Sequence, residues 1–244
     1  MNYFASAAQG QTNAWDGQSL RYVKSTIETS EAPKEFEHFV GTFPGHINPA
    51  KILDVGCGGG AWLRAMVSTF NGSTGVGLEP SAEGIRLLQK KHANCASISF
   101  VQGSAHQLPF PSNSFDLVVA WSVLHWIGRD EYLQALGELI RVTSSILLIM
   151  DFDPLDSYRT PYVHNPNFHI FKHDFEPLVI GTGIMKTIAS SRWRMEKDCL
   201  VPISVEERIP FAPNPVNWDC RKMVIFSKDY CSMPVFSKAD FLAV

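Results

Sequence analysis

Short apolar runs alternate with amphipathic segments over most of this chain. The runs at residues 51–55 and 74–79 end in glycine or acidic residues, and apolar residues at helical spacing follow each of them. This alternation is typical of buried parallel strands separated by helices. It predicts an α/β fold built on a doubly wound, mostly parallel sheet of seven strands. The strands are expected near residues 51–55, 74–79, 97–102, 115–120, 145–151, 186–194 and 222–228.

Two regions depart from the alternation. Residues 1–45 are polar and aromatic, and they predict a helical N-terminal cap before a core at residues 46–244. Inside the core, the regular pattern breaks after Asp151. Residues 152–185 are rich in aromatic residues, histidine and proline, so we expect an irregular insert that lines a binding site. The aromatic residues of the cap with helical spacing are Trp15, Tyr22, Phe36 and Phe39.

The first strand runs into Asp54 and a glycine cluster that begins at Gly56. Glycine lets a ligand lie against the backbone, and a helix start that follows favours an anionic or electron-rich group. The spacing also fits the loose dinucleotide pattern, but a carboxylate there would repel a pyrophosphate. Asp54 suits a cationic or amine-bearing ligand, or it accepts backbone amides within the loop.

A second acidic residue, Glu79, ends the next strand, about 20 residues after the first glycine. A carboxylate at this place binds the hydroxyls of a ribose in open α/β folds. The alternative is that Glu79 stabilises the start of the helix that follows.

Two more segments complete a pattern: Gly103-Ser104-Ala105 with Leu108-Pro109-Phe110, and Phe115-Asp116-Leu117-Val118-Val119. With the glycine turn and Glu79, they resemble the class I S-adenosylmethionine-dependent methyltransferases, most of all the small-molecule branch of the ubiquinone/menaquinone-biosynthesis type. The resemblance covers about residues 50–150 and implies S-adenosyl-L-methionine as cofactor, S-adenosyl-L-homocysteine as product and an antiparallel last strand. The cofactor-binding residues expected are Asp54, Gly56, Cys57, Gly58, Glu79, Pro80, Gly103, Ser104, Ala105 and Trp121.

One position departs from this family. Ser104 stands where the family usually has Asp, whose carboxylate accepts a hydrogen bond from the adenine amino group. A hydroxyl accepts such a bond less strongly, so a lower cofactor affinity is expected. Cys57 is interpreted as a small filler rather than a nucleophile.

His125 is the candidate general base. It follows the fourth strand at the carboxyl edge of the sheet, where open α/β folds bind ligands. The alternative is a packing histidine between Trp121 and Trp126. The substrate-binding residues expected are Tyr22, Trp126, Tyr158, Tyr162, His164, His169 and His173.

A metal site formed by the histidines of the insert is an alternative interpretation. His169 and His173 would share a face if they lay on a helix, with His164 or Asp174 nearby. Because Phe and Pro residues separate them and no recognised motif is complete, we expect no metal.

Composition narrows the function classes. The formal net charge is -3 and the pI is about 6.2, which disfavours nucleic acid as a partner. No stretch approaches a membrane span or a signal peptide. The five cysteines form no close pair, as expected of free thiols in the cytoplasm. A monomer or homodimer is expected.

The sequence thus predicts methyl transfer to a small molecule at oxygen, nitrogen or carbon. Two other functions stay open, an NAD(P)-dependent oxidoreductase and a catalytically silent protein that binds S-adenosylmethionine.

Overall fold

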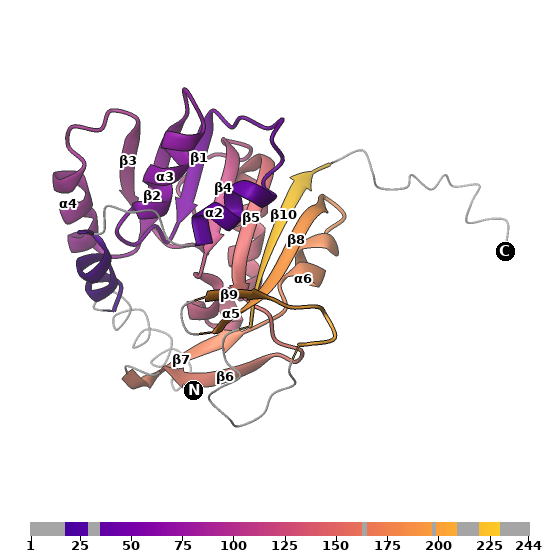
Figure 1. The fold of residues 1–244 in the computed structure, drawn as a ribbon. Coiled ribbons are helices and arrows are strands. Elements are labelled where there is room, and N and C mark those ends of the chain that lie inside the picture. Colours follow the sequence, from indigo (N-terminus) through magenta and orange to yellow (C-terminus); the bar gives the residue numbers. More distant parts are fainter. Residues whose placement is uncertain (1–17, 29–34, 163–164, 197–198, 209–219, 230–244) are drawn as a thin grey trace, which may run out of the picture.

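The computed structural model describes residues 18–28, 35–162, 165–196, 199–208 and 220–229. Its centre is a sheet in the order β3-β2-β1-β4-β5-β10-β8-β9 (Figure 1). The strands of this sheet are β1 (Lys51–Val55), β2 (Thr74–Glu79), β3 (Ile98–Gln102), β4 (Phe115–Trp121), β5 (Thr143–Phe152), β8 (Met185–Glu196), β9 (Cys199–Pro202) and β10 (Cys220–Lys228). The helices are a segment at residues 18–26, α2 (Glu35–Thr42), α3 (Ala61–Thr69), α4 (Ala82–Lys91), η1 (Leu124–Trp126), α5 (Arg129–Val142) and α6 (Glu176–Ile180).

The predicted strands are all present, within a few residues of the expected bounds. β1 to β5 pair in parallel, whereas β10 is antiparallel to both β5 and β8. The predicted number of seven strands is wrong by one in the described sheet, because β9 pairs with the edge of β8. A four-residue strand that ends in proline has too short a pattern to be recognised from sequence.

The central strands are buried on both faces. Ile52 and Val119 belong to the apolar cluster beneath α2, α3 and α4, and their neighbours Leu53 and Val118 belong to the cluster beneath α5. Successive side chains of a strand point to opposite faces. This alternation produces a three-layer α/β/α arrangement and places Asp54 on the same face as Ile52.

The described parts of residues 1–45 are helical. Phe36 and Phe39 of α2 pack on Trp62 of α3, with ring centroids 5.1 and 5.8 Å apart. The helix at residues 18–26 is tied to α4 by the ion pair between Glu28 and Lys91, at 2.7 Å. Trp15 lies outside the described residues, and a cap with a boundary at residue 45 stays a prediction.

The insert is more regular than its sequence indicates. β6 (Tyr158–Tyr162) and β7 (Asn165–Lys172) form an antiparallel two-stranded sheet, so the prediction of an irregular segment is wrong there. Pro161 is tolerated because β6 has a strand on one side alone. β7 packs against η1, which brings the hairpin to the carboxyl edge of the main sheet (Figure 1).

Candidate functional site

The turn after β1 has a left-handed backbone at Gly56 and Gly58, with φ of +72° and +51°. Glycine adopts this conformation without a steric penalty. A Cβ on Gly56 would lie 2.6 Å from Val123, and one on Gly58 would lie 2.9 Å from the ring of Tyr22. Both positions therefore require glycine, for the backbone conformation and for space.

Asp54 lies beneath this turn and is 2% exposed. Its Oδ2 has no hydrogen-bond partner among the described residues. Burial, reinforced by the negative charge of Glu79, raises the pKa of Asp54 to about 7. The Leu63 backbone amide at the start of α3 donates a hydrogen bond to the carboxyl and opposes this rise. Because Oδ2, beside open glycine backbone, still lacks a partner in the described part of the chain, the site suits a ligand that brings a positive charge or an amine.

Glu79 faces the same turn from the end of β2. Its carboxylate accepts a hydrogen bond from the amide of Gly58, at 3.1 Å, and another from the hydroxyl of Ser19. Burial raises the pKa of Glu79 to about 7. The Ser81 hydroxyl caps α4 by accepting from the Gly84 amide at 3.1 Å, and the Ser81 amide donates to the Glu79 carboxylate. Glu79 therefore contacts both the glycine turn and the residue that begins α4.

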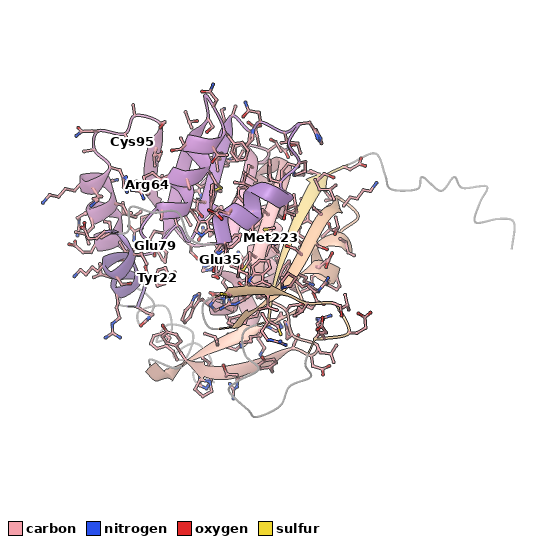
Figure 2. All side chains as sticks on the ribbon, in the orientation of Figure 1. Tyr22, Glu35, Arg64, Glu79, Cys95 and Met223 are labelled. Carbon is pink, nitrogen blue, oxygen red and sulfur yellow. The ribbon has the colours of Figure 1, made fainter. Side chains whose placement is uncertain are left out.

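The helix at residues 18–26 covers this part of the site. The hydroxyl of Ser19 donates to Glu79, and the ring of Tyr22 lies against Gly58. Figure 2 labels Tyr22 on this helix and Glu79 at the end of β2. Tyr22 is thus placed at the glycine turn and beside Glu79. No sequence pattern pointed to Ser19, because a single serine on a helix is not part of any motif.

The third turn of the pattern joins this edge at Gly103, whose amide donates to the carbonyl of Glu79 at 3.2 Å. Next to it, the Oγ of Ser104 lies 2.6 Å from Nδ1 of His106. The side chain of Gln102 donates to the Pro80 carbonyl at 3.1 Å. The residues expected around the adenosine therefore lie at one edge, and His106 is an addition that the sequence did not indicate.

Trp121 is half-buried among other tryptophans, and Cys57 is buried. The ring of Trp121 lies 3.8 Å from that of Trp62, centroid to centroid, and stacks on Trp193 at 6.4 Å. Burial, together with the charges of Asp54 and Glu79, raises the pKa of the Cys57 thiol well above its ordinary value. A neutral buried thiol agrees with the interpretation of Cys57 as a filler.

His125 lies in η1, just beyond the end of β4, and is buried. Its Nδ1 is 2.8 Å from Oδ1 of Asp151, and its backbone amide donates to Oδ2 at 3.2 Å. Burial lowers the pKa of His125, although the charge and hydrogen bond of Asp151 oppose this. At neutral pH His125 is therefore an uncharged imidazole that can accept a proton.

Part of the aromatic insert meets His125. The ring of Tyr162 lies edge-on to that of Trp126 at 4.7 Å, and Trp126 lies 4.9 Å from the ring of His125. Gln18 donates to the hydroxyl of Tyr162 at 3.5 Å, so the helix at residues 18–26 and the hairpin meet over this point. Tyr22, Trp126 and Tyr162 thus lie along one connected wall.

The other predicted wall residues are more scattered. Tyr158 lies near the ammonium of Lys172, and His169 pairs with Pro161 in the hairpin. His173 packs on the ring of Tyr132 in α5, 4.6 Å away. His164 lies outside the described residues.

A metal site in the insert required a helix that places His169 and His173 on one face. His169 lies on the strand β7 instead. In the described part of the chain, no three His, Cys, Asp or Glu side chains are grouped to hold a metal ion.

Two cations flank Phe152, the last residue of β5. The ammonium of buried Lys172 lies 3.8 Å from the centre of the Phe152 ring, and the guanidinium of Arg221 lies 3.7 Å from it. The ring of His125 meets the same phenylalanine edge-on at 4.9 Å. A positive environment therefore borders His125, and no local sequence signal predicted it, because its members are far apart in the chain.

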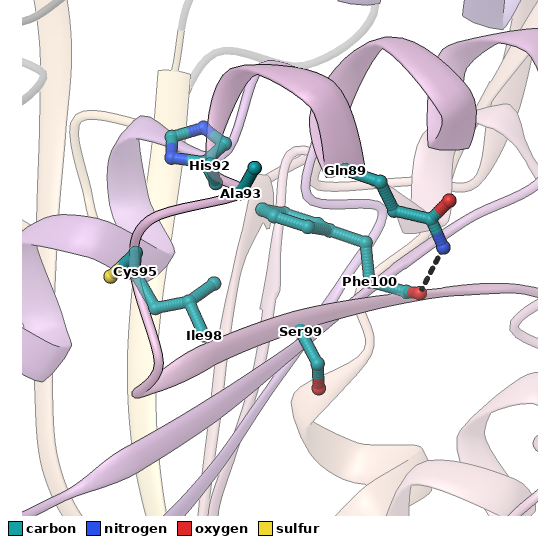
Figure 3. A pocket seen from close by; sticks show the side chains of 7 residues that line it. All are labelled: Gln89, His92, Ala93, Cys95, Ile98, Ser99 and Phe100. Carbon is teal, nitrogen blue, oxygen red and sulfur yellow. Dashed lines mark hydrogen bonds between the residues drawn. The ribbon is translucent and has the colours of Figure 1, made fainter.

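One hollow lies away from this edge, at the start of β3 and the end of α4 (Figure 3). Gln89, His92 and Cys95 line it, and Gln89 donates to the Phe100 carbonyl at 3.4 Å. It belongs to the amino edge of the sheet, so it is separate from the site described above.

The comparisons with known proteins agree with this geometry. Residues 52–145 match the family Methyltransf_25, described as "Methyltransferase domain". A fatty-acid O-methyltransferase of Mycolicibacterium smegmatis is 36% identical over 92 residues, which are 37% of this chain and 33% of the relative. A demethylmenaquinone methyltransferase of Staphylococcus aureus is 39% identical over 94 residues, 38% of each chain.

Among solved structures, the N-methyltransferase NodS of Bradyrhizobium japonicum, in complex with S-adenosyl-L-homocysteine, has a TM-score of 0.56 at 11% identity. The match covers 86% of this chain and 98% of NodS. The chain spans about a third of the length of the two curated relatives above. Residues 52–145 therefore match a methyltransferase domain, and the fold is shared with solved structures of S-adenosylmethionine-dependent methyltransferases.

Proposed function

We propose that this protein transfers a methyl group from S-adenosylmethionine to a hydroxyl oxygen of a small, largely apolar molecule. The observation that carries the proposal is the pair of buried carboxyls, Asp54 and Glu79, on either side of the glycine turn. Both have a raised pKa because burial is not offset by a protein cation. A ligand with a sulfonium, an amine and ribose hydroxyls supplies what these groups lack, whereas a pyrophosphate would add repulsion.

The residues present fit this cofactor. Asp54 would bind its amino group, the glycine backbone would lie along its methionine part, and Glu79 would accept hydrogen bonds from the ribose. Ser104 would accept one from the adenine amino group. When bound, the cofactor supplies an electrophilic methyl group on a good leaving group.

The aromatic residues next to His125 would bind and position the acceptor. Trp126 and Tyr162 form an aromatic wall, and small-molecule pockets are mostly apolar with a few polar contacts. The relatives are named for a fatty acid and for demethylmenaquinone, which supports a small apolar acceptor. Positioning of reactants accounts for roughly 7 to 11 kcal/mol of a barrier in favourable cases.

His125 would act as the general base. As the new carbon–oxygen bond forms and the carbon–sulfur bond breaks, Nε2 of His125 accepts the hydroxyl proton. Lys172 and Arg221 lie close enough to lower the pKa of His125 further, which keeps it uncharged before the reaction. The same two cations would stabilise negative charge that develops on the acceptor oxygen.

The test combines binding with transfer. Calorimetry should show micromolar binding of S-adenosylhomocysteine and no binding of NAD or NADP. A labelled methyl donor is then offered with dodecanol, 4-octylphenol and dodecanoic acid, and labelled product is expected with at least one hydroxyl compound. Transfer to dodecanoic acid alone would contradict a hydroxyl acceptor, and binding without any transfer would favour the silent binding protein.

We also infer a cytoplasmic protein that works as a monomer or homodimer without nucleic acid. The support is the net charge of -3 and the free thiols of Cys57, Cys95, Cys199 and Cys220. Within the described residues, no helix has the length and apolar character needed to cross a membrane. Light scattering on the purified full chain tests the oligomeric state, and a tetramer would contradict it.

A further inference from the structure

Asp151 is enclosed at the end of β5, directly beneath η1. β4 and β5 are parallel neighbours, and Trp121 pairs with Met150, so Asp151 lies just beyond the last pair. It is 3% exposed. Its carboxylate accepts from the Phe152 amide at 2.7 Å and from the His125 amide at 3.2 Å, and it lies 2.8 Å from Nδ1 of His125.

These contacts determine which nitrogen of His125 carries the proton. Two of the three groups around Asp151 are backbone amides, which always donate. An ionised carboxylate accepts hydrogen bonds and cannot donate one. Nδ1 of His125 must therefore carry a hydrogen, and in the uncharged ring the lone pair is on Nε2. Nε2 is the nitrogen on the side of the ring away from Asp151.

The ring is also held in one orientation. Trp126 lies 4.9 Å from it at a tilted angle, and Phe152 meets it edge-on at the same distance. The His125 side chain keeps 7% of its surface exposed. Because Nδ1 is engaged by Asp151, rotation of the ring would break the hydrogen bond as well as the aromatic contacts.

Resting on the proposed role of His125 as base, we propose that Asp151 is a positioning residue that holds His125 in the tautomer with a free Nε2 lone pair. Asp151 does not touch the acceptor in this role. It orients the base and stabilises the imidazolium that forms when the proton arrives, as a buried carboxylate does for histidine in other enzymes. The further consequence is a specificity for acceptors that have a proton to lose.

The charged groups around the pair agree with an ionised Asp151. Burial alone would raise the pKa of Asp151, but His125, Arg221 and the hydrogen bonds lower it. Lys172 of β7 and Arg221 of β10 both lower the pKa of His125, and Tyr132 of α5 stays protonated with a raised pKa. At neutral pH the pair is thus a carboxylate and an uncharged imidazole.

The first test needs no acceptor and no change at Asp151. Nitrogen NMR of the full chain with ¹⁵N-labelled histidine, with S-adenosylhomocysteine added, reports the tautomer of each histidine, and His125→Gln assigns the signal. We expect protonated Nδ1 and unprotonated Nε2 at pH 7.5. A signal with the proton on Nε2 overturns the proposal, whether or not methyl transfer is ever observed.

The second test uses Asp151→Asn with Asp153→Asn as its matched control. An amide cannot accept on both sides, so in Asp151→Asn an NH₂ group faces a backbone N–H in either orientation. We expect kcat for the hydroxyl probe to fall by about 10²- to 10⁴-fold, with KM within about threefold. Asp153 is equally buried but bonds to Arg192, so its variant should lose stability and keep kcat within about threefold.

The pH profile separates positioning from a structural role. The charge of Asp151 raises the pKa of His125, so its removal should shift the acidic limb of kcat/KM to lower pH. A purely structural loss lowers the plateau without that shift. An unshifted limb in a folded Asp151→Asn protein would overturn the proposal. A complete absence of transfer in the unmodified protein would instead remove the proposed function and leave the tautomer result standing.

Discussion

Asp54 and Asp151 are both buried carboxyl groups at the carboxyl edge of one sheet, yet their pKa values shift in opposite directions. The pKa of Asp54 rises to about 7, and that of Asp151 falls below its ordinary value. Burial raises both, but Asp151 accepts from two backbone amides and a histidine, whereas Oδ2 of Asp54 has no partner among the described residues. Hydrogen bonds and nearby charges, rather than burial, decide the outcome.

The difference separates the two halves of the site by their roles. Asp151 is satisfied by the protein and orients a neighbour, which is the condition of a positioning group. Within the described residues, Asp54 and Glu79 are buried without a protein cation beside them. A ligand would supply the positive charge that these carboxyls lack and further hydrogen-bond donors. The predictions below test this contrast.

The largest loss of activity is expected when His125, the residue that Asp151 orients, is replaced. His125→Gln should lower kcat for a hydroxyl acceptor by about 10²- to 10⁴-fold, because the proton then lacks an acceptor. Calorimetry should find S-adenosylhomocysteine binding within about twofold of the unmodified protein. His38→Gln, which alters a half-buried histidine bonded to Ser191, is the control. A matching loss in both variants would remove His125 from the catalytic role.

The next effect concerns the cofactor side. Asp54→Asn should weaken S-adenosylhomocysteine binding by roughly 10- to 100-fold, since a charge-assisted hydrogen bond contributes about 1.5–3 kcal/mol. Glu79→Gln should weaken it to a similar extent. Asp116→Asn is the control, because Asp116 accepts the amides of Ala50 and Lys51 at the opposite edge. Unchanged affinity in both site variants would contradict the assignment.

The contrast should also appear in stability without any ligand. A carboxyl whose folded pKa exceeds its unfolded value stabilises the fold below the unfolded pKa, and this contribution is lost as the pH rises through the folded pKa. For Asp54 this window runs from about 4 to about 7. Asp54→Asn should therefore raise the free energy of unfolding at pH 8 by up to about 4 kcal/mol, since one pKa unit corresponds to about 1.4 kcal/mol.

At pH 4 the same variant should be close to the unmodified protein. Asp151→Asn should lower the free energy of unfolding at pH 8 by about 1–3 kcal/mol, because it leaves buried donors without an acceptor. Urea unfolding at the two pH values measures both. If the free energy of unfolding changes with the same sign in both variants at pH 8, the proposed contrast between Asp54 and Asp151 is wrong.

The smallest effect is expected at the adenine end. Ser104→Asp should tighten S-adenosylhomocysteine binding several-fold, since an ionised acceptor makes a bond about twice as strong. The gain should vanish with S-inosylhomocysteine, which lacks the adenine amino group. An equal gain with both compounds in calorimetry would show that Ser104 does not face that group.

Local patterns in the chain predicted much of the fold. The parallel strands lie where expected, because the strand period is recorded in neighbouring residues. The antiparallel direction of β10 was implied by the family resemblance and not by that period. The hairpin at Tyr158–Tyr162 and Asn165–Lys172 was missed, since Pro161 and the clustered aromatic residues hide its pattern. β9 was missed because four residues hold too little signal.

The candidate site divides in the same way. The sequence by itself determined the glycine turn and the two acids that face it, because turn, strand end and helix start follow one another within a few residues. Only the tertiary structure decided that Ser19 reaches Glu79, that Lys172 and Arg221 flank Phe152, and that Asp151 holds His125. The physical reason is that these contacts join residues on different elements, and their distances and burial exist only once the elements pack.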